Sequence, residues 1–154
     1  MRRSRARSGA SALPGAMLAA ALAAAPALGQ GLEEPLTAVP GDPVAGAAIV
    51  GEPTRGLCLL CHAGPFPDVP FQGTLAPPLD GVGARLSVPE LRLRIVDSRQ
   101  VNSASIMPPY HSLVGLTRVG ERWQGDTILS AQEVEDVVAF LATLTDPPIP
   151  EETE

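Results

Sequence analysis

The chain has 154 residues, of which 17 are acidic and 11 basic, giving a formal net charge of −6 at pH 7. This length allows one domain with processing and linker segments, and the acidic balance excludes an electrostatic surface for nucleic acid. Only three Phe, one Tyr and one Trp are present, so small and aliphatic side chains must fill the core. A large apolar cofactor would relieve that shortage.

Residues 1–29 have the pattern of a secretory signal peptide. Four arginines ending at Arg7 form a positive n-region, and an alanine-rich apolar stretch follows from Met17 to Leu28. Small residues precede Gln30 and predict cleavage there; the alternative is an alanine-rich first helix of the mature domain. Loss of the four arginines would take the net charge from −6 to −10. We expect a periplasmic protein without membrane insertion after cleavage, because no other run approaches the roughly 18 apolar residues of a spanning helix.

The first predicted element of the mature chain is a short helix that follows a linker. Residues 30–41 contain two prolines and few large apolar side chains, which is typical of a linker. Asp42 can cap a helix and Pro43 suits its first turn, so the sequence predicts a helix from there to about Gly51.

Two further helices are predicted from capping boxes, in which a Ser caps the helix and a Glu three residues later bonds back to it. The box Ser87–Glu90 begins a helix that runs to about Asp97. The box Ser130–Glu133 begins the last helix, which prolines stop before a tail at residues 146–154. Its apolar stripe consists of Val134, Val137, Val138, Leu141 and Leu144.

Long irregular segments separate these helices. Five prolines between His62 and Gly81 prevent regular structure there, and Met107 lies in a second loop, followed by two prolines. Residues 116–124 are ambiguous, with a short β-turn excursion around Val119 as one interpretation. The sequence therefore predicts an all-α fold of three or more helices, and a haem surrounded by the loops would explain their length.

The two cysteines lie in one motif, Cys58-Leu59-Leu60-Cys61-His62. Each thiol can add to one haem vinyl group, and the two-residue gap matches the separation of the vinyls on the ring. His62 follows directly and can bind the iron, so the motif predicts one covalent haem c, attached by Cys58 and Cys61. Attachment outside the cytoplasm agrees with the leader.

Three other interpretations of the motif are open. A zinc site would need four ligands, and the mature chain offers only Cys58, Cys61, His62 and His111, with His62 adjacent to Cys61. A thioredoxin-like dithiol requires a βαβ context that the sequence lacks. A structural disulfide would close a strained four-residue loop.

The sixth iron ligand is predicted by elimination. Met1 and Met17 leave with the leader, so Met107 is the mature chain's only methionine, and His/Met ligation suits electron transfer. His111 is the rival ligand, and an open or water-bound site is the third possibility. The ordinary alternative for a lone Met is core filling.

Further predictions concern the surroundings of the haem. The Pro77 carbonyl could fix the His62 ring, as outer partners of metal ligands do. Three arginines could pair with haem propionates or simply be solvated: Arg85, Arg94 and Arg99. Tyr110 and Trp123 are expected near the ring, with core packing equally open for Trp123.

Three segments besides the haem motif resemble one family, the SoxX subunit of sulfur-oxidising systems. They are residues 73–83 (GTLAPPLDGVG), 101–108 (VNSASIMP) and 128–138 (ILSAQEVEDVV). With the haem motif, the resemblance covers roughly residues 42 to 144, and we place the domain at 42–145. The last segment is the most specific, since the haem motif alone indicates only a cytochrome c.

The resemblance implies a class I-like cytochrome c fold, ligation by His62 and Met107, and tight pairing with a SoxA-like haem protein. In the family that pair conjugates thiosulfate oxidatively to a cysteine of a carrier protein, as an L-cysteine S-thiosulfotransferase. The reactive haem belongs to SoxA, so this chain would hold no catalytic residue and would pass electrons to a downstream acceptor. The alternatives are a free, diffusible periplasmic cytochrome and a non-redox binding protein with a structural disulfide.

Overall fold

The computed structural model describes residues 30–146. The predicted signal peptide, and the tail from residue 147 on, lie outside this range. The described chain has four α-helices and no strand, which confirms the all-α prediction. The helices are α1 (Pro43–Gly51), α2 (Val82–Arg85), α3 (Val88–Asp97) and α4 (Ala131–Thr143). Three short 3₁₀ turns complete it: η1 (Cys58–Leu60), η2 (Ser98–Gln100) and η3 (Glu121–Trp123).

The three predicted helices begin at the predicted caps. Asp42 accepts a hydrogen bond from the Val44 N–H at 2.8 Å, which satisfies a free donor of the first turn of α1. At α4, the Ser130 N–H donates to the Glu133 carboxylate at 2.7 Å, and Ser130 accepts from the Glu133 N–H at 3.3 Å. The single turn α2 was not predicted, and within residues 116–124 only Glu121–Trp123 form a helical turn, η3.

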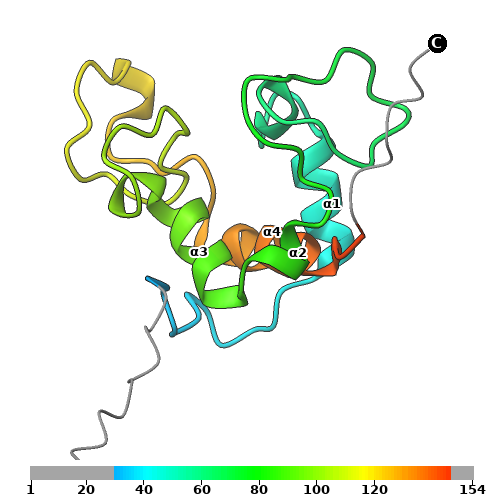
Figure 1. Cartoon of the computed structure of the whole chain (residues 1–154). Helices are drawn as coiled ribbons and strands as arrows, with labels where there is room; N and C mark the ends of the chain where they lie inside the picture. Colours follow the sequence, from blue (N-terminus) through cyan, green and yellow to red (C-terminus); the bar gives the residue numbers. More distant parts are fainter. Residues whose placement is uncertain (1–29, 147–154) are drawn as a thin grey trace, which may run out of the picture.

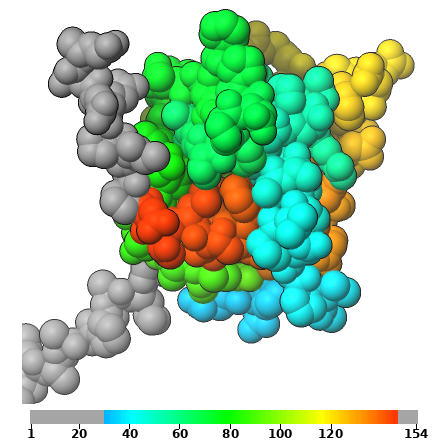
Figure 2. All heavy atoms as spheres, turned by 90° about the vertical axis from the view of Figure 1, so that its right-hand side faces the viewer, coloured from blue at the N-terminus to red at the C-terminus, as the bar shows by residue number. Residues whose placement is uncertain are grey.

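Helix α4 is the centre of the packing. Its most extensive contact is with α1, and α3 also packs against it. The crossing of α1 and α4 is close at Gly46, where a Cβ atom would lie 2.0 Å from the Asp136 carbonyl oxygen. Only glycine allows this approach. Figure 2 shows the two helices in contact, α4 in orange and α1 in cyan.

The loops gather into two groups, with α4 below and between them (Figure 1). Residues 52–81 lie beside α1, and residues 98–128 lie beside α3. Both groups are anchored to the helices by backbone hydrogen bonds, such as Tyr110 N–H to the Ile95 carbonyl at 3.2 Å. No helix within residues 30–146 is long and apolar enough to cross a membrane.

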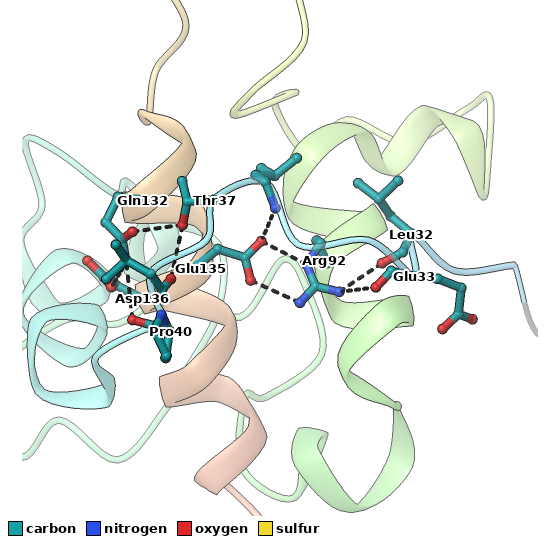
Figure 3. Close-up of polar contacts among 10 residues, drawn as sticks. Leu32, Glu33, Thr37, Pro40, Arg92, Gln132, Glu135 and Asp136 are labelled. Atoms are coloured by element: carbon teal, nitrogen blue, oxygen red, sulfur yellow. Dashed lines mark hydrogen bonds and ion pairs between the residues drawn. The ribbon is translucent and has the colours of Figure 1, made fainter.

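Residues 32–40, here called the N-terminal strap, are bound to α3 and α4 by polar contacts (Figure 3). Arg92 and Glu135 form a buried bidentate pair at 2.8 and 2.9 Å. Arg92 also donates to the Leu32 carbonyl at 2.8 Å, and Glu135 accepts from the Leu36 N–H at 2.9 Å. Burial acts to raise the pKa of Glu135, but the hydrogen bonds from Arg92 and Leu36 outweigh it, so this pKa lies below its ordinary value.

Candidate functional site

A largely apolar cavity lies between the two groups of loops, with α4 contributing Val137 and Leu141 to its wall. It encloses about 900 Å³ of atom-free space, part of which opens to solvent. Cofactor pockets are mostly apolar, with a few polar groups that orient the bound molecule. The lining residues are Val50, Leu57, Cys58, Leu60, Cys61, His62, Leu75, Ala76, Leu79, Ile95, Ile106, Met107, Pro108, Tyr110, Val137 and Leu141.

The haem motif forms a tight turn at this cavity. Leu57 adopts a left-handed conformation (φ 58°) that starts η1, and the N–H groups of Cys61 and His62 both donate to the Cys58 carbonyl, at 3.2 and 3.0 Å. The turn thereby presents both half-buried thiols and the imidazole to one space. Burial raises the pKa of the Cys58 thiol. Gly73 allows the next loop to pass, because a Cβ there would lie 2.2 Å from the Leu60 carbonyl oxygen.

The His62 ring is oriented by the loop that follows. Its Nδ1 lies 2.6 Å from the Pro77 carbonyl oxygen. A carbonyl can only accept, so Nδ1 carries the proton and the Nε2 lone pair is left for a ligand. Arg85 donates to the carbonyls of Pro78 at 3.2 Å and Asp80 at 2.7 Å, and so braces the same loop. The expectation for Pro77 thus has a geometric basis.

Met107 lines the cavity from the other group of loops, together with its neighbours Ile106 and Pro108. It is half-buried and packs against the core. His111, the rival ligand, is not among the lining residues. Its Nδ1 lies 2.8 Å from the Leu129 carbonyl oxygen, which directs this ring atom toward the loop before α4. The fold brings His62 and Met107 to one cavity and leaves His111 outside its wall.

Tyr110 and Trp123 differ in placement. Tyr110 is buried and lines the cavity, and burial beside Cys58 raises the pKa of its phenol above the ordinary value. Trp123 is 55% exposed, lies outside the cavity wall, and its ring stacks with the Arg122 guanidinium at 4.5 Å. The expectation of core packing for Trp123 is therefore wrong, and its placement gives no support to the expectation of haem contact. The tryptophan lies on η3, in a loop whose position the sequence pattern did not predict.

None of the three arginines considered for propionates lines the cavity. Arg85 braces the Pro77 loop, and Arg94 donates to the Glu90 carbonyl at 3.2 Å. Arg99 forms an ion pair with Asp97, with both guanidinium–carboxylate distances at 2.7 Å. That hydrogen bond lowers the pKa of Asp97.

Sequence reasoning missed most of the apolar wall. Val137 and Leu141 belong to the predicted apolar stripe of the last helix, so their burial is expected from the sequence, but their place on a cavity wall is not. Ile95 lies in the predicted helix that begins at Ser87, and it lines the same cavity. Leu75 and Leu79 stand in the proline-rich loop, where isolated leucines among prolines were the available signal.

The residues present suit a c-type haem. The wall is apolar, the paired thiols and the oriented imidazole share one turn, and a thioether from a distant loop reaches the same space. Within residues 30–146, no group of three or more His, Cys, Asp or Glu side chains could hold a metal ion. This arrangement disfavours a zinc site and matches haem ligation, in which the porphyrin supplies the remaining donors.

No family model and no curated protein sequence matches the chain. Among solved structures it is similar to a chain in the crystal structure of SoxXA from P. pantotrophus, with 38% sequence identity and a TM-score of 0.69. The match covers 76% of this chain and 91% of that chain. The likeness therefore extends beyond the fold to the sequence, over nearly the whole of the compared chain.

Proposed function

Because this chain belongs to the SoxX family, we propose that it is the one-haem, electron-accepting subunit of a SoxAX-type complex in the periplasm. Residues 1–29 would direct export, and residues 42–145 would form a class I-like cytochrome c domain, followed by a tail at 146–154. The observation that carries the proposal is the apolar cavity that holds the Cys58–His62 turn and Met107 together.

Each site residue has a distinct role in this proposal. Cys58 and Cys61 would attach the haem covalently, and His62 and Met107 would hold its iron. Pro77 keeps the His62 ring in the required tautomer and orientation. A bound haem supplies one-electron redox chemistry, and the apolar wall excludes water from it.

Three exposed side chains of the cavity wall form the rim through which electrons would pass. Leu60, Leu75 and Ile106 are 62%, 70% and 77% exposed, although each also lines the cavity. Exposed apolar side chains around a cofactor opening are suited to contact with a protein partner. A SoxA-like haem protein seated on this rim would bring its own haem close to this cavity.

The sulfur chemistry belongs to the partner in this proposal. Conjugation of thiosulfate to a carrier thiol forms an S–S bond and releases two electrons and one proton. Both cysteines of this chain are committed to haem attachment, so no thiol remains as a nucleophile. An acidic chain also repels a small anion such as thiosulfate. This chain would therefore accept the electrons one at a time and pass them on.

The test is purification of the tagged mature protein from the periplasm, with haem counted on each separated chain. We expect one haem on this chain, co-elution of a second haem protein, and haem reduction by thiosulfate once the carrier protein is added. A lone one-haem chain that stays oxidised with thiosulfate would instead support a free electron carrier, with fast and salt-sensitive encounters. Absence of visible absorption would contradict both and favour a non-redox binding protein.

The axial ligand is tested separately with Met107→Ala. Loss of the thioether should abolish the weak near-infrared band of the oxidised protein that thioether–iron ligation produces. His111→Ala is the matched control and should leave the band in place, because that side chain lies outside the cavity wall. A wild-type protein that lacks the band would instead favour His111 or an open site over Met107.

A further inference from the structure

The backbone of Met107 is bonded on both sides by two serine hydroxyls. Its N–H donates to the Ser105 Oγ at 3.3 Å, and its carbonyl accepts from the Ser98 Oγ at 3.1 Å. The two hydroxyl oxygens lie 2.8 Å apart. These three contacts form a closed circuit around one residue. It joins the Met107 loop to the start of η2, directly after α3.

Only one direction of hydrogen bonding satisfies every group in this circuit. A backbone N–H can only donate and a carbonyl can only accept, whereas each hydroxyl has one proton to give. The Met107 N–H must therefore donate to Ser105, so that Ser105 donates to Ser98 and Ser98 donates to the Met107 carbonyl. Each hydroxyl then donates once and accepts once, an arrangement in which hydrogen bonds strengthen one another.

Ser98, one member of the circuit, is held in place by its surroundings. Ser98 is only 6% exposed, and the residue before it, Asp97, accepts from the Arg99 N–H at 3.2 Å and pairs with the Arg99 guanidinium. Ile95, three residues before Ser98, is itself part of the cavity wall. On the other side of Met107, Pro108 has a restricted φ and no N–H to donate elsewhere. The circuit therefore sets the position of Met107 relative to the cavity.

We propose that Ser98 and Ser105 are positioning residues that hold the Met107 thioether at the iron. The inference rests on the proposed haem ligation and adds what keeps the ligand in place. The loop around Met107 has no regular structure. A ligand side chain on such a loop dissociates readily from the iron unless its backbone is held in place, because dissociation increases the conformational entropy of the loop. The circuit opposes this departure, since Met107 cannot leave the iron without breaking partly buried hydrogen bonds.

The test compares how readily imidazole displaces the thioether in the oxidised holoprotein. The variants are Ser98→Ala and Ser105→Ala, with Ser98→Thr as the version that retains a hydroxyl. Ser103→Ala is the matched control, an exposed serine of the same loop. Imidazole affinity is read from the optical spectrum, and the near-infrared band reports the thioether directly.

We expect Ser98→Ala to raise imidazole affinity roughly three- to tenfold, the range that corresponds to one net hydrogen bond. Ser105→Ala should act in the same direction but less, because its bond to the Met107 N–H is long. Ser98→Thr should lie nearer the wild type, and Ser103→Ala should be unchanged. If Ser98→Ala fails to fold, the half-buried Ser105 provides the same comparison.

The possible outcomes distinguish this inference from the proposed function on which it rests. A wild-type protein without the near-infrared band would overturn both the Met107 ligation and the inference. A wild type with the band, and Ser98→Ala and Ser105→Ala variants with unchanged imidazole affinity, would overturn the inference alone. A lowered melting temperature with unchanged affinity would also overturn it, because the hydroxyls would then serve folding and not ligation.

Discussion

The two sides of α4 differ in polarity: one faces the apolar cavity, and the other makes polar contacts with the N-terminal strap. Toward the cavity the helix presents Val137 and Leu141, and the other residues that line the cavity are mostly apolar. Toward the N-terminal strap it presents Gln132 and Glu135, which bond to strap residues or to Arg92, and Asp136, which accepts from the Asp42 N–H just after the strap (Figure 3). Glu135 and Val137 are two residues apart and point about 200° apart around the helix axis.

The difference indicates which side of α4 is stable without a bound cofactor. The strap side satisfies its buried polar groups within the chain, and no buried side-chain nitrogen or oxygen in residues 30–146 lacks a partner. The cavity side encloses apolar surface that only a bound group could cover. We infer that the strap side holds the helices in place before haem arrives, and that haem completes the cavity side. The four predictions below test that division.

The largest expected effect comes from removing one partner of the buried ion pair. Arg92→Ala leaves the Glu135 carboxylate buried without its guanidinium, which costs about 3–5 kcal/mol of unfolding free energy. Urea denaturation with and without haem measures it. Arg94→Ala on the same helix is the control, expected within about 0.5 kcal/mol of wild type because Arg94 bonds only along its own helix. Equal losses in both variants would contradict the division.

The second prediction concerns the crossing of α1 and α4. Gly46→Ala places a Cβ 2.0 Å from the Asp136 carbonyl oxygen, so the helices must separate, at a cost of about 1–3 kcal/mol. Gly51→Ala in the same helix is the matched control. Its Cβ would meet only ring atoms of Phe66 at 3.1 Å, and that side chain can shift. In thermal unfolding, the melting temperature of Gly46→Ala should lie well below that of Gly51→Ala.

The third prediction is a dependence on acid that originates on the strap side. The pKa of Glu135 lies below its ordinary value of 4.5, so the stability it contributes is present above that value and lost as the pH falls through the folded pKa. We expect Glu135→Gln to be less stable than wild type near pH 7, with the difference shrinking in acid. Asp97 also has a lowered pKa and adds to the slope of both proteins. A difference that stays constant from pH 7 to pH 3 would contradict the assignment.

The smallest effect on stability is expected at the rim. Leu75→Ser and Ile106→Ser should change the unfolding free energy by at most about 0.5 kcal/mol, because both side chains are largely exposed. Both should weaken co-elution with the second haem protein. Val39→Ser, at 62% exposure on the strap, is the matched control and should leave co-elution intact. Equal weakening by all three variants would place the partner elsewhere.

Local signals in the sequence predicted the helices well and their mutual placement not at all. The caps at Asp42, Ser87 and Ser130 depend on neighbours within three residues, so α1, α3 and α4 begin where predicted. The strap is a contrasting case. Its prolines indicated a linker, and its contacts with Arg92 and Glu135 join residues more than fifty positions apart. The sequence pattern carries no such distance information.

The sequence by itself determined the chemistry that depends on adjacent residues, because Cys58, Cys61 and His62 are held together by the covalent chain. It also indicated Met107 by elimination, without locating it. Only the tertiary structure decided that Met107 and His62 line one cavity while His111 and Trp123 lie outside it. The physical reason is that loop positions are set by packing and by long-range contacts such as the Ser98–Met107 hydrogen bond. Those contacts exist only once the helices have met.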